Sequence, residues 1–145
     1  NIILHRDLEN TVLDEACRVV SGTLQDPYTG EEIQFTKDES AKVQIDHVVA
    51  LSDAWQKGAQ SLPKATREQL ANDPLELLAV SDAQNQAKSD GDAATWLPKN
   101  KAFRCEYVAR QIAVKKKYSL WVSPAEKDAM KSVLEGCPGQ VLPAS

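Results

Sequence analysis

Residues 43–52, Val-Gln-Ile-Asp-His-Val-Val-Ala-Leu-Ser, constrain the fold and the chemistry of this chain more than any other stretch. Their first half alternates apolar and polar residues, which predicts a strand over 43–47. That strand ends in an adjacent acid and imidazole, Asp46 and His47. A single histidine in an apolar run is commonly a packed core residue, and short motifs are weakly specific. The stretch alone therefore leaves a structural and a catalytic interpretation of the histidine open.

A strand over residues 75–80 and a helix over 82–88 are predicted further along the chain. Ser81 is a favourable N-cap for this helix. Asn85 and Lys88 are three residues apart and therefore share one helix face. If the two predicted strands pair and the helix packs over them, this face meets the acid and the imidazole at the end of the first strand.

This convergence combines groups that suit phosphodiester hydrolysis. The carboxylate of Asp46 and the amide oxygen of Asn85 are hard ligands for Mg²⁺, with Mn²⁺ as the alternative. The neutral imidazole of His47 takes a proton from water near neutral pH, and Lys88 adds positive charge. Ordinary roles are also open: Asp46 can pair with a basic residue, Asn85 can bond the loop after its helix, and Lys88 can interact with the helix dipole.

Charge is distributed unevenly along the chain. The formal net charge of −4 is not typical of a nucleic-acid-binding domain, yet residues 98–118 hold seven basic residues against one acidic residue. This segment is expected either to contact a nucleic-acid backbone or to form the solvated side of a helix. The candidate contacts are Lys99, Lys101, Arg104, Lys115 and Lys116.

Length and composition indicate one globular domain over residues 1–145, since 42% of the residues are hydrophobic and 26% are charged. No run of about eighteen apolar residues occurs, so no membrane insertion is expected. The chain has neither a starting Met nor a basic-then-apolar leader, so a trimmed or mature form is expected. A monomer or a small homo-oligomer is expected.

Three cysteines and two histidines lack the paired spacing of a structural zinc site, so no such zinc is expected. Predicted helices over 101–117 and 124–135 form a hairpin, in which Cys105 and Cys137 lie at similar distances from the tip. An antiparallel pair brings them level, which predicts a disulfide and an oxidising compartment. Cys17 is then left over, which indicates a partner outside this chain. Three buried thiols in a cytosolic protein are the alternative.

The N-terminal part predicts a β-hairpin. Residues 17–24 and 32–35 read as strands on either side of the turn Asp26-Pro-Tyr-Thr-Gly30. Residues 1–9 read as the end of a helix and 36–41 as a loop. Between the two central strands, helices are expected over 50–59 and over 66–72, the second capped by Thr66. The tryptophans are expected in the core or in groove walls rather than as platforms for bases: Trp55, Trp96 and Trp121.

Four motifs follow one another in the order Ile45-Asp-His-Val-Val-Ala-Leu-Ser-Asp-Ala-Trp55, Asn72-Asp-Pro-Leu-x-Leu-Leu-Ala-Val80, Asn85-x-x-Lys88 and Thr95-Trp-Leu-Pro98. In this order they resemble the HNH (His-Me finger, ββα-metal) endonucleases. The DUF1524-like branch, found in exported actinobacterial proteins and in the C-terminal part of a modification-dependent restriction system, is the most similar. Residues 17–30 and 100–105 also resemble that branch, so the resemblance covers most of the chain.

The resemblance implies a role for each site residue. His47 is implied as the general base, Asp46 and Asn85 as metal ligands, and Lys88 as a phosphate contact or a support of the site. The middle Asn of such sites braces the metal-binding loop, whereas this chain has Glu76 at the corresponding position. That departure leaves the bracing role open, since a further carboxylate can instead alter metal binding. Many relatives also carry a four-cysteine zinc knuckle, which this chain cannot build.

Taken together, the patterns and the resemblance predict an α+β fold. It has a ββα-metal core over about 43–89, an N-terminal β-hairpin and a C-terminal helical hairpin. The predicted function is metal-dependent endonucleolytic hydrolysis of DNA by an exported protein, extracellular or in the cell envelope. One alternative is a non-catalytic nucleic-acid- or protein-binding module on a degenerate HNH scaffold. Another is an enzyme that acts on a different phosphodiester or on a cell-envelope substrate.

Overall fold

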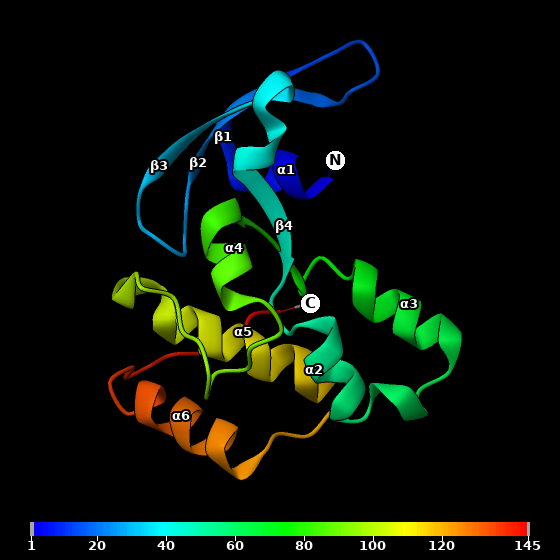
Figure 1. The fold of residues 1–145 in the computed structure, drawn as a ribbon, viewed down its shortest axis with the longest axis vertical. Coiled ribbons are helices and arrows are strands. Elements are labelled where there is room, and N and C mark those ends of the chain that lie inside the picture. Colours follow the sequence, from blue (N-terminus) through cyan, green and yellow to red (C-terminus); the bar gives the residue numbers. More distant parts are fainter. Residues whose placement is uncertain (1, 145) are drawn as a thin grey trace.

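The computed structural model describes residues 2–144 and begins with a short helix followed by a three-stranded antiparallel sheet (Figure 1). The helix is α1 (Ile2–Asp7), and the strands are β1 (Leu8–Leu13), β2 (Val19–Gln25) and β3 (Glu32–Thr36). The predicted hairpin corresponds to β2 and β3. Pairing of β1 with β2 extends it to a sheet that was not predicted.

Strand β1 was not predicted from the sequence, because it lacks a hydrophobic face. Only Leu8 of its six residues is buried, and its register with β2 shifts twice. Backbone pairing rather than side-chain burial therefore holds this strand. The turn that follows it contains Cys17, which is exposed and has a φ of 61°, so this residue precedes strand β2 instead of starting it.

The ββα unit has the predicted arrangement. Strand β4 (Val43–His47) pairs antiparallel with β5 (Leu77–Ser81), and helix α4 (Asp82–Lys88) follows directly. The Ser81 hydroxyl accepts a hydrogen bond from the backbone N–H of Gln84, so the predicted N-cap is confirmed. A short 3₁₀ segment, η1 (Lys37–Lys42), stands where a loop was expected and leads into β4.

Two helices occupy the excursion between β4 and β5: α2 (Leu51–Gln56) and α3 (Lys64–Asn72), with the 3₁₀ turn η2 (Ala59–Ser61) between them. The first ends three residues before the expected limit. The second begins at Lys64, with Pro63 and not Thr66 at its N-cap, and no side chain caps it. Thr66 lies inside the helix, where its backbone N–H donates to the carbonyl of Pro63 at 3.0 Å, so the expected Thr66 cap is wrong.

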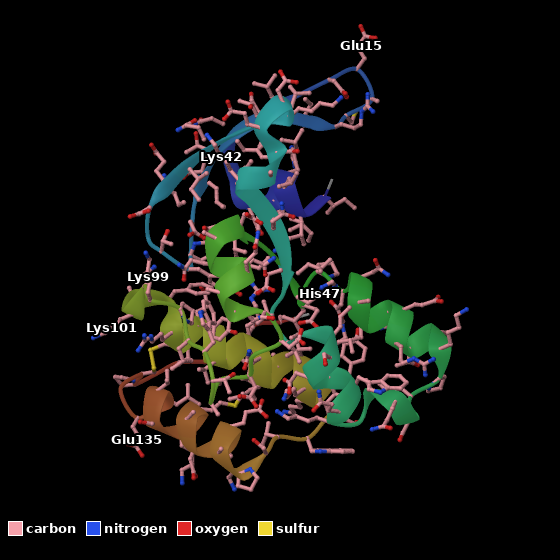
Figure 2. All side chains as sticks on the ribbon, viewed as in Figure 1. Glu15, Lys42, His47, Lys99, Lys101 and Glu135 are labelled. Carbon is pink, nitrogen blue, oxygen red and sulfur yellow. A yellow bond between two sulfur atoms is a disulfide. The ribbon has the colours of Figure 1, made fainter. Side chains whose placement is uncertain are left out.

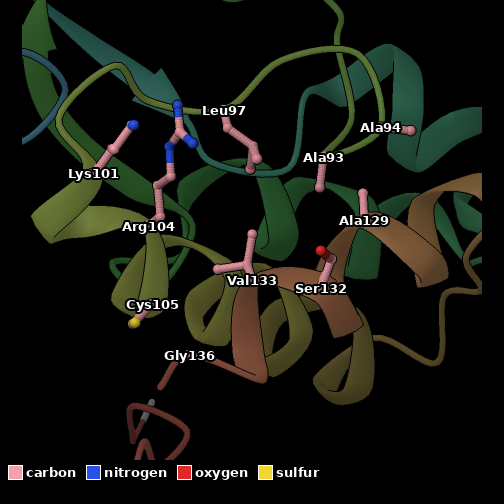
Figure 3. Close-up of a pocket in the computed structure, with 10 residues that line it drawn as sticks. All are labelled: Ala93, Ala94, Leu97, Lys101, Arg104, Cys105, Ala129, Ser132, Val133 and Gly136. Carbon is pink, nitrogen blue, oxygen red and sulfur yellow. The ribbon is translucent and has the colours of Figure 1, made fainter.

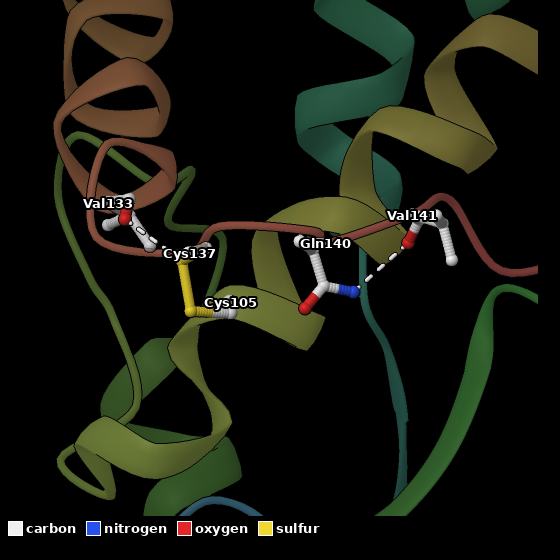
Figure 4. Close-up of a disulfide and its surroundings, with 5 residues drawn as sticks. All are labelled: Cys105, Val133, Cys137, Gln140 and Val141. Atoms are coloured by element: carbon white, nitrogen blue, oxygen red, sulfur yellow. Dashed lines mark hydrogen bonds between the residues drawn. A yellow bond between two sulfur atoms is a disulfide. The ribbon is translucent and has the colours of Figure 1, made fainter.

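The C-terminal part is the predicted helical hairpin. It consists of η3 (Lys101–Phe103), α5 (Arg104–Lys117) and α6 (Pro124–Leu134). Ser123 and Glu126 form the capping box that starts α6, as predicted. Cys105 and Cys137 are joined by a disulfide with a Cα–Cα distance of 5.8 Å, which confirms the predicted pairing (Figure 4).

A shared core connects these parts. One cluster of buried side chains contains Tyr28 from the β2–β3 turn, Val80 from β5, Tyr107 from α5 and Met130 from α6. The architecture is the predicted α+β class, with small antiparallel sheets packed on helices. Within residues 2–144, none of the helices combines the length and the apolar character needed to cross a bilayer.

Candidate active site

Asp46 lies at the end of β4 with its carboxylate almost fully enclosed. Its side chain receives Lys88 Nζ at 2.8 and 3.1 Å and the hydroxyl of Tyr28 at 2.5 Å. Burial, followed by the neighbouring Asp46 charge, raises the pKa of the Tyr28 phenol well above its usual value. Tyr28 therefore stays protonated and donates to the carboxylate. The sequence interpretation missed Tyr28, because the turn motif around it was assigned only a structural role.

Lys88 is directed into the interior of the ββα unit. Its ammonium also donates to the backbone carbonyl of His47 at 2.6 Å, and its side chain is 0% exposed. A fully enclosed ammonium group fixes the end of β4 and cannot reach a phosphate in this conformation. Of the two roles implied by the resemblance, the geometry therefore favours support of the site over phosphate contact.

His47 is oriented by a backbone group of α3. Its Nε2 lies 2.9 Å from the carbonyl oxygen of Ala71. A carbonyl oxygen only accepts, so Nε2 carries the hydrogen, and in the neutral ring Nδ1 holds the lone pair. The half-buried imidazole thus presents an unprotonated nitrogen on its other side, which is the form that a general base requires.

Asn85 meets Asp46 and His47 at one pocket of about 230 Å³. The expected convergence of the three side chains is therefore present in the structure. The pocket is also bordered by Asp90, which follows α4 and was not identified from the sequence. The complete lining comprises Ile45, Asp46, His47, Ala50, Leu51, Ser52, Asn85, Ser89 and Asp90.

The oxygen atoms at this pocket suit a hard divalent ion. Among residues 2–144, Oδ1 of Asp46 has Lys88 as its one hydrogen-bond partner, so it keeps a lone pair. Within the described residues, the side chains of Asn85 and Asp90 make no hydrogen bond or ion pair. Mg²⁺ takes few protein oxygens and retains several waters, so a sparse set of oxygens such as this one fits its chemistry.

Glu76 braces the loop that follows His47. Its Oε1 accepts from the backbone N–H of Val49 at 2.6 Å, and its backbone carbonyl accepts from Val48 at 2.8 Å. Gln111 adds a bond from its amide to the carbonyl of Val48 at 2.9 Å. Burial raises the pKa of the Glu76 carboxyl to about 9, so this group is neutral near pH 7. Glu76 thus braces the loop after His47 through these bonds, and as a neutral group it adds no charge there.

A second group of carboxylates lies near the C-terminal hairpin. Asp53, Asp92 and Glu126 place oxygens close enough together to hold a metal ion. Lys57 contacts all three at 2.5 to 2.8 Å, and Lys115 contacts two of them. Burial lowers the pKa of Lys57, but these carboxylates outweigh it and raise the pKa above its usual value. The two ammonium groups thus occupy the position that an ion needs.

Lys115 is consequently not a surface residue. It is 3% exposed and bonds Glu126 at 2.5 Å, which corrects its prediction as a nucleic-acid contact. The sequence did not reveal this, because Lys115 lies between other basic residues at the end of α5. Lys99, Lys101 and Lys116 are exposed, and Lys99 and Lys101 lie together near the start of α5 (Figure 2).

Arg104 and Lys101 border a broad groove of about 560 Å³ between α5, α6 and the segment before α5 (Figure 3). The Nε atom of Arg104 donates to the carbonyl of Pro98 at 2.7 Å, which holds the guanidinium at the rim. The predicted basic contacts therefore fall into two groups, one at this groove and Lys116 at the opposite end of α5. They do not form one continuous stripe.

The tryptophans divide between core and surface. Trp96 packs edge-on against Tyr28 with ring centroids 5.0 Å apart, as expected of a core residue. Trp121 is 57% exposed and Trp55 is 49% exposed, so burial in the core is wrong for both. Trp55 instead lines a small pocket, which agrees with the groove-wall alternative.

Comparison with known proteins identifies two similarities. Residues 3–133 match the family described as GmrSD restriction endonucleases, C-terminal domain. An uncharacterized secreted protein of Arthroderma benhamiae is 40% identical over 137 residues, which cover 93% of this chain and 65% of that protein. A secreted relative and the disulfide of this chain both agree with the predicted export.

Proposed function

Because the chain belongs to the family of GmrSD restriction endonuclease C-terminal domains, which matches residues 3–133, we propose that it is an exported, metal-dependent endonuclease. The proposed reaction is hydrolysis of nucleic-acid phosphodiesters, with DNA as the favoured substrate. The observation that carries the proposal is the meeting of Asp46, His47 and Asn85 at one pocket.

In this proposal His47 removes a proton from the attacking water through Nδ1. The bond from Nε2 to Ala71 keeps the ring in the required tautomer and orientation. Asp46 and Asn85 hold Mg²⁺ or Mn²⁺, and Lys88 and Tyr28 hold Asp46. The chemistry supplied by a bound divalent ion is stabilisation of the charge that develops on the phosphate and on the leaving oxygen.

Backbone contacts are proposed for Lys99, Lys101, Arg104 and Lys116. Such contacts respond to salt and do not read sequence. Low sequence specificity therefore accompanies the proposed activity.

Plasmid cleavage by the purified protein, measured with Mg²⁺, with Mn²⁺ and with EDTA, tests the proposal. Cleavage is expected to need a metal and to disappear in His47→Ala. Asn85→Ala is expected to lower the rate at least about tenfold, whereas Gln86→Ala, an exposed neighbour on the same helix, serves as the matched control. Wild-type protein that cleaves with no metal, or His47→Ala that cleaves normally, contradicts the proposed roles.

One observation favours a second candidate, a non-catalytic binding module. Asp46 already has Lys88 and Tyr28 as partners, so each of its carboxylate oxygens accepts a hydrogen bond from the protein without a metal. In that case the wild-type protein cleaves nothing with either metal. The wild-type protein and His47→Ala then bind nucleic acid or a protein partner with the same affinity.

A further inference from the structure

An apolar pocket lies beside the His47 pocket. It is walled by Trp55 and Arg67 and floored by the aliphatic side chains of Ala54, Ala59 and Leu70. Leu51 borders both pockets. Ala71 also lines the apolar pocket, and its carbonyl is the group that orients His47. The two pockets are therefore linked by Leu51, which lines both of them, and by the bond between His47 and Ala71.

The outer wall of this pocket consists of apolar groups left open to solvent. Leu51 is 43% exposed and Trp55 is 49% exposed. They are four residues apart on α2 and therefore share one face. Beneath them, Ala54 and Leu70 are 1% and 2% exposed, so the floor is firmly packed. A solvent-exposed indole beside a well-packed apolar surface is typical of a site that binds a ligand.

Arg67 gives the pocket a positive charge. The Cζ atom of its guanidinium lies 5.6 Å from the centroid of the Trp55 ring, and Nη1 donates to the carbonyl of Leu62 at 2.5 Å. Among residues 2–144, no carboxylate pairs with this guanidinium. Its charge is therefore available to a polyanion that passes over the pocket.

The size of the pocket limits its occupant. Its volume is about 160 Å³, whereas pockets for drug-sized ligands begin at about 300 Å³. A single flat ring fits such a space between an indole wall and an aliphatic floor. Bases that leave the stack commonly bind on aromatic side chains in this way.

We propose that this pocket binds one unstacked nucleobase, from the nucleotide next to the phosphate that lies at His47. This proposal rests on the proposed function and adds a feature to it. For Trp55 it also replaces the expectation from the sequence that the tryptophans do not serve as platforms for bases. The protein engages the strand through one base of any identity as well as through its phosphates. Single-stranded or locally opened substrate is then favoured over intact duplex, because a paired base cannot enter.

Binding in EDTA, with His47→Ala as the background protein, tests the pocket separately from cleavage. The probes are a fluorescent oligothymidylate and an abasic oligodeoxynucleotide of the same length, which carry the same backbone charge. The base-bearing probe is expected to bind about tenfold more tightly. Trp55→Leu is expected to abolish this difference, and Trp55→Phe, which keeps a ring, to retain part of it. Trp121→Leu removes an indole of similar exposure outside the pocket and is expected to retain the whole difference.

The outcomes separate the pocket from the nuclease. Equal affinity for the two probes, or a base preference that survives in Trp55→Leu, overturns the pocket even if the wild-type protein cleaves DNA. A base preference that depends on Trp55 supports the pocket even if no cleavage occurs. Self-association that is lost in Trp55→Leu, without any base preference, overturns the proposal in favour of a second copy of the chain. Thermal unfolding of each variant shows whether it is folded. If Trp55→Leu is unfolded, the base preference of Trp55→Phe tests the pocket in its place.

Discussion

Tyr28 donates its phenolic hydrogen to Oδ2 of Asp46, and Lys88 approaches the same oxygen at 2.8 Å. An equivalent arrangement occurs elsewhere: Tyr118 donates to Oδ2 of Asp73 at 2.5 Å, and Lys117 reaches that oxygen at 2.7 Å. Neither Tyr118 nor Asp73 lines the His47 pocket. The chain thus contains a matched pair of tyrosine–aspartate–lysine groups, one at the candidate site and one away from it.

Tyr28→Phe is expected to weaken Mn²⁺ binding and to lower the cleavage rate, each by roughly tenfold or more, because partners that orient a metal ligand typically contribute 10–100-fold. Electron paramagnetic resonance of free Mn²⁺ measures the binding directly. Tyr118→Phe removes the same kind of hydrogen bond and is expected to leave both quantities unchanged. Equal losses in the two variants indicate a general effect on stability and exclude a specific role for Tyr28.

Glu76 is expected to make the protein less stable as the pH rises. Its pKa is about 9 in the folded state and about 4.3 in an unfolded chain. Between these values the folded state keeps a proton that the unfolded state has lost, so the free energy of unfolding falls with increasing pH. Glu76→Gln, which keeps the acceptor for Val49, is expected to remove this part of the decline.

Thermal unfolding from pH 5 to pH 9 measures that effect. The variant is expected to unfold at a higher temperature than the wild type at pH 8, and the advantage is expected to diminish toward pH 5. Parallel curves for the two proteins over the whole range contradict a raised pKa at Glu76. Glu31→Gln, at an exposed carboxylate, is the control.

The disulfide is expected to contribute roughly 3–4 kcal/mol to the free energy of unfolding, since it closes a loop with a sequence separation of 32 residues. Urea denaturation of a double variant, Cys105→Ser with Cys137→Ser, measures the loss. Cys17→Ser is expected to change nothing, because Cys17 is exposed and unpaired. Titration of thiols in denaturant without reductant is expected to find one, and a count of three contradicts the bridge.

Lys115 and Lys116 are expected to behave oppositely although they are neighbours. Lys115→Met leaves the buried carboxylate of Glu126 with one cationic partner fewer and is expected to cost about 3–5 kcal/mol of stability. Lys116→Met is expected to leave stability within about 0.5 kcal/mol and to reduce the salt dependence of DNA binding. Chemical denaturation and binding at several salt concentrations separate the two effects. Similar stabilities for the two variants contradict the assigned burial.

The sequence predicted best where several local signals agreed. The limits of β4 and α4 match the prediction, because alternation ended at His47 and Ser81 supplied a cap. The capping box at Ser123 and the cysteine pairing were likewise encoded by residue type and spacing. The shared pocket of Asp46, His47 and Asn85 followed from these local elements once the strands paired.

The remainder depends on contacts between distant residues. Strand β1 has no amphipathic pattern and exists through backbone pairing with β2. Lys115 looks like a solvated lysine until Glu126, from another helix, is placed against it. The role of Tyr28 is hidden for the same reason, since its partner Asp46 lies in a different strand and no spacing rule connects them.

The turn that carries Tyr28 is fastened to the ββα unit at more than one point. Asp26 accepts a hydrogen bond from the backbone N–H of Ser81, the residue that caps α4, and Tyr28 reaches Asp46. Residues 43–89 therefore cannot be exchanged between proteins as a self-contained cassette. A transplanted ββα unit keeps the histidine and both proposed ligands, yet it leaves behind the hydroxyl that orients one of them. In recombination or design, the smallest set of residues that transfers this site intact is discontinuous, because it includes residues 26–30 as well as 43–89.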